Sequence, residues 1–174
     1  MRISKLWPQA EWKVIWKNLQ AAPVSDPVKI TWYRVNHDII PTNTRLHRIH
    51  ISSTDTCKEC GIRDTLGHRL TVCGEGFSTW SKTRSIIARI LRSLAAYIPD
   101  ELLVRPQFRL WPPQRQRAVL WVIAQFVYFR MNNPRTLSRQ DLMDFLKRSK
   151  WKLYKQPSRS KSVANFLTVL DMPY

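Results

Sequence analysis

Apolar residues recur at helical spacing through most of the chain. Trp12, Ile15, Trp16 and Leu19 fall on one helix face and predict a helix over residues 9–20. A second pattern starts at Asp26-Pro27, a cap followed by a first-turn proline, and runs to Pro41. A third, short helix begins at residue 42. Alternating apolar and polar runs are few, so a fold built mainly of sheet is not expected.

The second half repeats this organisation. A long amphipathic helix extends from Phe77 to Ile98 and ends before Pro99. Residues 99–113 hold four prolines and form the best boundary within the chain. The helix over 113–131 is so apolar that it must be largely buried, and the last helix opens with a Ser138 and Asp141 capping box. We expect tryptophans on the apolar stripes to be core residues: Trp12, Trp16, Trp32, Trp80 and Trp121.

Composition supports a folded chain without a membrane span. The 174 residues are 44% hydrophobic and 11% aromatic, which is enough to bury a core. The longest apolar run, 118–129, is broken by Gln125 and is shorter than the roughly 20 residues that a spanning helix needs. The N-terminus lacks the features of a secretory signal. We therefore expect an intracellular, reducing location, where three cysteines suggest metal before disulfide.

Positive charge is concentrated near the C-terminus. The chain has 29 Lys and Arg against 12 Asp and Glu, a formal net charge of +17. Residues 130–161 hold ten cations and two acids, whereas residues 57–73 hold three cations and two acids. An excess of this size implies an anionic partner, and the C-terminal stretch is the first candidate for phosphate contact.

The strongest motif is Cys57-x2-Cys60-x7-His68-x4-Cys73. Zinc prefers four tetrahedral thiolate and imidazole ligands, and a two-residue gap lets one tight turn direct both of the first two sulfurs to a single ion. Gly61 suits such a turn. A closed Cys3His set leaves no position for water or substrate, so the zinc would be structural. The alternatives are three reduced thiols with an unrelated histidine, or His50 as a substitute ligand.

The last two ligands constrain the local backbone. His68 and Cys73 are five residues apart, about 140° around an α-helix, so they could not share a face if that helix continued. A short helix holding His68 should therefore end before Cys73.

These segments together resemble a known family. The elements are Trp12-Lys-Val-Ile-Trp16, Val28 through Trp32 to Asp38, Ile40-Pro-Thr-Asn43 with Leu46, the cysteine cluster, and Trp80. Their order resembles the zinc-binding region at the C-terminal end of non-LTR retrotransposon reverse transcriptases, over about residues 7–90. The proline-arginine connection and the helix around Trp121 are similar to the next segments in arthropod elements of this kind.

The resemblance implies a module downstream of a polymerase. Such a module helps to hold element RNA and target DNA during target-primed reverse transcription, in the nucleus or in a cytoplasmic ribonucleoprotein. Only the residues that match the family's cluster inherit a role, as structural zinc ligands: Cys57, Cys60, His68 and Cys73. The partners implied are RNA or DNA, and the reverse transcriptase core of the same polyprotein is a further candidate. The chain looks like a terminal fragment, a partial copy or a stand-alone derivative.

No catalytic constellation is evident. The polymerase's paired aspartates are absent, and Asp100-Glu101 is the only adjacent pair of acids. A restriction-like nuclease needs metal-binding carboxylates with an acid two residues before a lysine, whereas Asp144 lies three before Lys147. We expect the chain itself to be non-catalytic.

Two surfaces are candidates for nucleic-acid contact. Cations alternate with aromatics in the last helix, a composition that pairs phosphates and stacks unpaired bases; the candidates there are Lys147, Arg148, Lys150, Trp151, Lys152 and Lys155. The second surface lies around the cysteine cluster and comprises Arg45, Arg48, Arg63 and Arg69. In the alternative interpretation of the last helix, Trp151 and Leu153 pack inward below a solvated basic face.

The sequence thus predicts a mainly α fold. Residues 1–98 would form a small zinc-stabilised helical domain, residues 99–155 a basic helical segment and residues 156–174 a mobile tail. The expected function is nucleic-acid binding. The alternative is a protein-docking module whose basic helices pack on the polymerase core or an acidic host factor. In isolation, the helix around Trp121 would then expose part of its apolar face.

Overall fold

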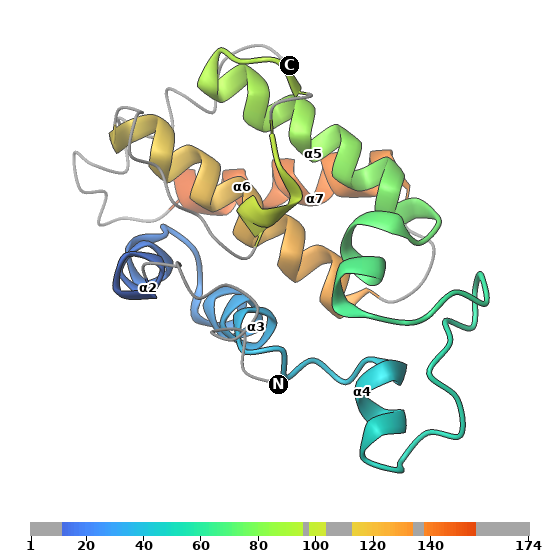
Figure 1. The fold of residues 1–174 in the computed structure, drawn as a ribbon. Coiled ribbons are helices and arrows are strands. Elements are labelled where there is room, and N and C mark those ends of the chain that lie inside the picture. The colour runs from blue at the N-terminus through green and yellow to red at the C-terminus, as the bar shows by residue number, and fades with distance from the viewer. Residues whose placement is uncertain (1–11, 96–97, 104–112, 134–137, 156–174) are drawn as a thin grey trace.

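The computed structural model describes residues 12–95, 98–103, 113–133 and 138–155, and these are mainly helical (Figure 1). Within these ranges the only β pairing is one isolated bridge between Thr56 and Arg63. The mainly α fold predicted from the sequence is confirmed. The elements in chain order are α2 (Trp12–Ala21), α3 (Asp26–Asn36), α4 (Asn43–Arg48), η1 (His68–Val72), α5 (Glu75–Leu91), η3 (Asp100–Leu103), α6 (Pro113–Asn132) and α7 (Arg139–Tyr154).

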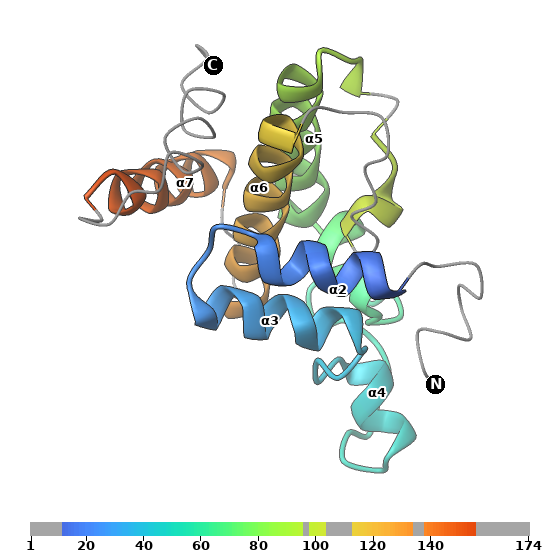
Figure 2. The same cartoon turned by 90° about the vertical axis from the view of Figure 1, so that its left-hand side faces the viewer.

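Helix α6 lies at the centre of the molecule. It contacts α3, α5 and α7, and every residue from Ala118 to Val127 is buried (Figure 2). A helix that is apolar all round must be covered on every side, as the sequence predicted for residues 113–131. α4 and the loop after it lie at one edge, beyond the packed helices (Figures 1 and 2).

Three of the five expected core tryptophans anchor this packing. Trp32, Trp80 and Trp121 are at most 2% exposed. The Trp32 indole donates to the carbonyl of Leu103 at 2.8 Å, which attaches α3 to the η3 turn. Trp16 is half-buried against the core. Trp12 opens α2, but its side chain lies outside the described part of the structure.

The boundaries of two helices, α5 and α3, differ from the sequence prediction. α5 ends at Leu91 and does not reach Ile98, because Arg92 adopts a left-handed conformation (φ 55°) and Ser93 N–H bonds back to Ala88. As a result Leu94 is exposed, and Phe77, on the outer side of α5, is exposed as well. α3 is capped by Ser25, not by Asp26, and ends at Asn36.

The start of α7 is as predicted. Ser138 Oγ accepts from the Asp141 backbone, and the Asp141 carboxylate accepts from Ser138 N–H, which completes the capping box. Buried Leu142, Leu146 and Leu153 turn α7 toward the same core that α3 and α5 share. The division at residue 98 stays a prediction, and the tail after residue 155 lies outside the described residues. Among the described helices, none is long and apolar enough to cross a membrane.

Candidate metal centre

The cysteine segment, residues 42–74, begins with a well-capped short helix. Thr42 Oγ1 accepts from Arg45 N–H at the start of α4. The Asn43 side chain donates to the Thr56 carbonyl at 2.7 Å, and Thr44 N–H donates to the Asp64 carbonyl at 3.3 Å. These bonds attach α4 to the loop that carries the first two cysteines.

A tight turn presents Cys57 and Cys60. Gly61 N–H donates to the Cys57 carbonyl at 2.9 Å, and Cys57 N–H donates to the Ile62 carbonyl at 2.7 Å. Gly61 has φ 72°, in the left-handed region, and a Cβ there would meet no atom within 4 Å. The glycine is therefore required by backbone conformation and not by close approach.

A single π-type turn places the other two ligands. η1 begins at His68 and ends at Val72, and Cys73 N–H donates to the His68 carbonyl at 2.8 Å. Because this wider turn bonds residue i to residue i+5, it brings together two positions that an α-helix would separate. Cys73 itself is extended, so the helix holding His68 ends before Cys73, as the spacing required.

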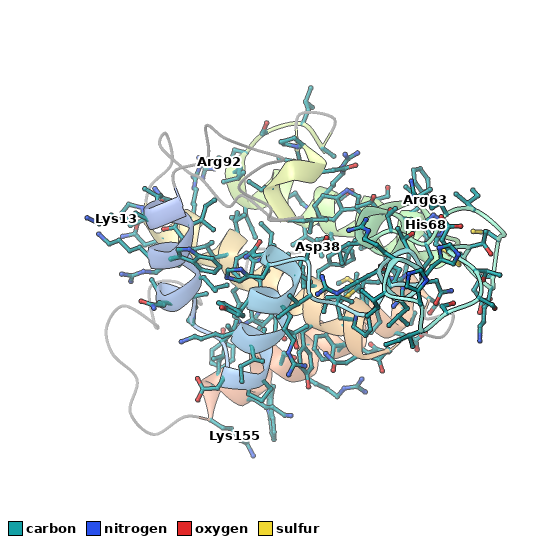
Figure 3. All side chains as sticks on the ribbon, turned by 60° about the horizontal axis from the view of Figure 1, so that its bottom comes forward. Lys13, Asp38, Arg63, His68, Arg92 and Lys155 are labelled. Carbon is teal, nitrogen blue, oxygen red and sulfur yellow. The ribbon has the colours of Figure 1, made fainter. Side chains whose placement is uncertain are left out.

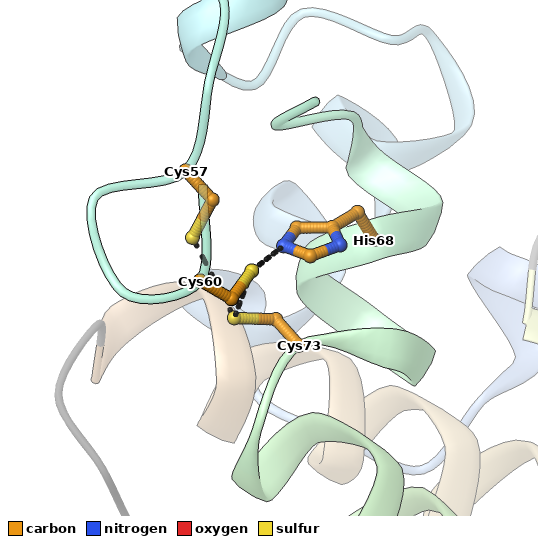
Figure 4. Close-up of side chains that lie close together, drawn as sticks. All are labelled: Cys57, Cys60, His68 and Cys73. Atoms are coloured by element: carbon orange, nitrogen blue, oxygen red, sulfur yellow. Dashed lines mark hydrogen bonds between the residues drawn. The ribbon is translucent and has the colours of Figure 1, made fainter. Parts of the chain in front are cut away.

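The four side chains converge on one point (Figure 4). Cys57 Sγ lies 3.6 Å from Cys73 Sγ, which lies 3.9 Å from Cys60 Sγ, and all four ligand atoms are within 4.8 Å of one another. Cys60 Sγ is 3.3 Å from His68 Nε2. In a tetrahedral site with zinc distances the S–S edge is about 3.8 Å and the S–N edge about 3.5 Å. The donor set therefore fits a small tetrahedral ion.

The alternatives for this cluster do not fit the geometry. His68 is 5% exposed and faces the sulfurs through Nε2, so the histidine is not unrelated to the thiols. His50 is exposed, follows α4 and is not among the clustered ligands. Nδ1 of His68 is buried without a hydrogen-bond partner. Among the described residues, Cys57, Cys60, His68 and Cys73 could hold a metal ion.

The pKa values of the Cys57 and Cys73 thiols are shifted in opposite directions. Burial would raise the pKa of the Cys57 thiol, but the backbone N–H of Glu59, the His68 side chain and further hydrogen bonds lower it to about 7. For Cys73, burial comes first, and hydrogen bonds and charge from Cys57 and Cys60 add to it, raising its pKa to about 12. Three thiols this close cannot all ionise without a cation among them.

Asp64 is the polar centre of the cysteine segment and was not singled out by the sequence. Its side chain is 2% exposed. The carboxylate accepts a hydrogen bond from Asn43 N–H at 2.6 Å and two from Arg69, from Nε at 2.7 Å and from Nη2 at 2.5 Å. Burial opposes ionisation, but the Arg69 and Asn43 hydrogen bonds outweigh it and lower the pKa of Asp64. Its contribution to stability is thus present above the ordinary carboxyl pKa and is lost as pH falls through the lowered one.

Few apolar side chains support this segment. Leu70 is the one large apolar residue between 42 and 74 that is fully buried. Exposed apolar residues are more numerous there: Ile49, Ile51, Ile62 and Val72. The other buried side chains are polar: Thr42, Thr44, Asp64 and His68. Hydrophobic burial within this stretch is therefore small, and polar contacts such as those of Asp64 make up much of its packing.

Contacts of the π-type turn join the cluster to the helical body. Arg130 of α6 donates a hydrogen bond from Nη2 to the carbonyl of Arg69, a residue of η1, at 2.9 Å. The same guanidinium nitrogen lies 3.2 Å from where a Cβ on Gly76 would be. Leu70 inserts into the core from the same turn. The π-type turn consequently attaches the cysteine cluster to α5 and α6.

The predicted nucleic-acid residues around the cluster are mostly engaged locally. Arg69 is committed to Asp64, and Arg45 donates to the Asp38 carbonyl. Arg63 pairs with Asp55 at 3.0 Å but remains exposed, as does Arg48.

On α7 the predicted residues are more open. Trp151 is 57% exposed, with the Lys155 ammonium 3.8 Å from its ring centroid, whereas Leu153 is buried. Lys147 is exposed and lies 3.8 Å from Asp144. Lys150 is half-buried, 6.0 Å from the Tyr154 ring. Arg148 and Lys152 are exposed. Figure 3 shows Lys155 and Arg63 on opposite sides of the molecule, so the two groups form separate surfaces.

The carboxylates considered for nuclease chemistry have structural partners. Asp100 Oδ1 accepts from the Trp80 indole at 2.6 Å and from the Arg84 guanidinium. Asp144 accepts from Gln140 at 2.9 Å and lies near Lys147 on the same helix.

Replacing Gly61 separates backbone strain from side-chain packing. We expect Gly61→Ala to destabilise the chain by about 1–2 kcal/mol, because alanine must adopt φ 72°. Gly67→Ala is the matched control, since Gly67 has helical φ −60° and room for a Cβ. Urea unfolding with metal present measures both, and equal effects of the two substitutions would contradict the assignment.

Removing the Asp64 charge tests the polar centre. We expect Asp64→Asn to cost about 3 kcal/mol at neutral pH, because it leaves a partly buried Arg69 without its carboxylate. Asp55→Asn breaks the exposed pair with Arg63 and should cost under about 1 kcal/mol. Thermal unfolding of the two variants side by side measures the difference, and similar losses would refute a central role for Asp64.

Comparisons with models of protein families, with curated proteins and with solved structures find no match to this chain.

Proposed function

We propose that this chain is a zinc-stabilised nucleic-acid-binding module, itself non-catalytic. The resemblance of residues 7–90 to the end of non-LTR retrotransposon reverse transcriptases suggests its context. There it would hold element RNA or target DNA during target-primed reverse transcription. The observation that carries the binding proposal is the open cationic and aromatic face of α7 on a chain of net charge +17.

Zinc is the metal that the ligand chemistry favours. Three thiolates and one imidazole are soft donors suited to zinc, and their spacing matches tetrahedral edges. All four protein ligands are used, so the ion would cross-link the chain and have no open position for substrate. Zinc would thereby supply the folding free energy that the sparse apolar burial of the cysteine segment does not.

The basic face of α7 consists of Arg148, Trp151, Lys152 and Lys155. Each of these residues lies three or four positions from two others of the set, so together they line one side of the helix. The buried leucines lie on the opposite side. Phosphates would pair with the cations, and an unpaired base could stack on Trp151 in place of Lys155.

The docking alternative has less support. It requires an apolar face on the helix around Trp121, but this chain buries Ala118 to Val127 of α6 itself. Nuclease activity has less support too, because Asp100 is already bonded to Trp80 and Arg84. Binding by charge and stacking is the function that remains best supported.

Metal titration tests the proposed ion. We expect the reduced chain to bind one Co²⁺, with the visible spectrum of a tetrahedral thiolate site, and to release it to one equivalent of Zn²⁺. His68→Ala should weaken binding by at least about tenfold, since one of four ligands is lost. His50→Ala is the control and should not alter the spectrum. An octahedral spectrum, or no effect of His68→Ala, would contradict the proposal.

Salt dependence tests the α7 face. We expect RNA affinity to fall steeply with salt, and we expect the triple variant Arg148→Gln, Lys152→Gln, Lys155→Gln to lower the slope of log K against log salt by about 2. A variant with Lys82, Arg89 and Arg92 changed to Gln removes the same charge from α5 and its C-cap and serves as control. Fluorescence anisotropy with a labelled oligonucleotide measures the slope. Equal slopes for the two variants would reject α7 as the contact surface.

A further inference from the structure

A groove of about 500 Å³ opens between α2 and α3, far along the chain from both the cluster and α7. The two helices lie side by side at one face of the molecule (Figure 2). Trp16 lines the groove from α2, and Lys29, Ile30, Tyr33 and His37 line it from α3 and its C-terminal end. Its volume is in the range of pockets that hold a small organic ligand.

Three aromatic rings in this groove contact one another. His37 stacks on Trp16, with ring centroids 4.9 Å apart and planes at 12°. Tyr33 is 4.2 Å from His37 and 5.4 Å from Trp16. The trio forms because Trp16 faces α3, while Tyr33 and His37 are four residues apart on one side of that helix.

This cluster is not a core cluster. Tyr33 is 46% exposed, Ile30 is 50% exposed and His37 is also exposed, while Val28, Trp32 and Val35 supply the buried side of α3. An apolar body that reaches the surface with preformed ring faces suits a flat, unsaturated ligand.

The charge around the groove selects an anionic ligand. Between residues 12 and 38 the chain has four cations, Lys13, Lys17, Lys29 and Arg34, against two acids, Asp26 and Asp38. Lys29 lines the groove directly, and no carboxylate of the described residues does. Lys13 extends from the outer side of α2, on the side of the molecule away from Arg63 and His68 (Figure 3).

We infer that the groove between α2 and α3 binds an unpaired base of a single-stranded nucleic acid. The base stacks on the Trp16, Tyr33 and His37 rings, and its phosphate pairs with Lys29. This inference rests on the proposed function and adds to it a second contact, with specificity for unpaired strands. A duplex, whose bases are already stacked on each other, cannot use the rings.

Tyr33→Ala tests the inference, because the Tyr33 side chain is exposed and is not part of the core cluster. We expect its affinity for a labelled oligo(U) to fall at least about fivefold, while its affinity for a duplex of the same length stays within about twofold of wild type. Tyr33→Phe keeps the ring and should bind oligo(U) like wild type. Phe77→Ala removes an exposed ring from α5 and should leave both affinities unchanged. Circular dichroism checks that each variant folds.

The possible outcomes distinguish a failure of the groove inference from a failure of the proposed function. If wild type binds oligo(U) and Tyr33→Ala binds it equally well, the groove inference is overturned and the proposed function stands. An equal loss for single strand and duplex also overturns it, since it indicates charge contact without stacking. If wild type binds neither nucleic acid, the proposed function fails. Loss of oligo(U) binding confined to Tyr33→Ala, with rescue by Tyr33→Phe, supports the inference.

Discussion

The cysteine segment, residues 42–74, has almost no hydrophobic core of its own. The geometry of the candidate metal site depends on the polar contacts that hold this segment in one conformation. Leu70 is its only fully buried large apolar side chain. Two polar groupings lie where this burial is missing: the Cys3His cluster, which could hold a metal ion, and the Asp64 carboxylate with its Arg69 and Asn43 partners. Each ordered residue costs on the order of 1–2 kcal/mol of backbone entropy, and under the proposed function a bound ion would supply part of the free energy that offsets this cost.

The remainder of the described chain, in contrast, packs around a hydrophobic core. α6 is buried along most of its length, and three tryptophans fix α3, α5 and the η3 turn around it. Arg130 and Leu70 join the two parts through the π-type turn that also positions His68 and Cys73. The cysteine cluster is therefore joined to the helical body through this turn, while α7 and the groove between α2 and α3 lie against the hydrophobic core.

Several features could be predicted from the sequence because each has a local cause. The capping box at Ser138 and the apolar character of α6 follow from adjacent residues. The convergence of four ligands follows from cysteine spacing, and even the end of the helix before Cys73 follows from the angle between positions five apart. Metal ligands are rare residue types, so their spacing stands out from the background.

Other features have no such local signal. α5 ends where Arg92 adopts a left-handed conformation, a position that glycine usually occupies. Because no glycine marks this end in the sequence, the apolar repeat predicted a helix as far as Ile98. Asp64 resembles an ordinary turn residue until the fold brings Asn43 and Arg69 to it, and Arg69 was accordingly predicted to contact phosphate. The aromatic groove depends on how α2 packs against α3, which neither helix specifies alone.

Amide hydrogen exchange on the full chain, with zinc and after chelation, tests most directly whether the metal organises the cysteine segment. We expect chelation to remove protection from the amides of α4 and of His68–Val72, while the amides of α6 stay protected by the core. Unchanged protection in the cysteine segment without metal would contradict a structural role for the ion. So would a loss that is as large in α6 as in the segment, because the metal would then hold the whole fold.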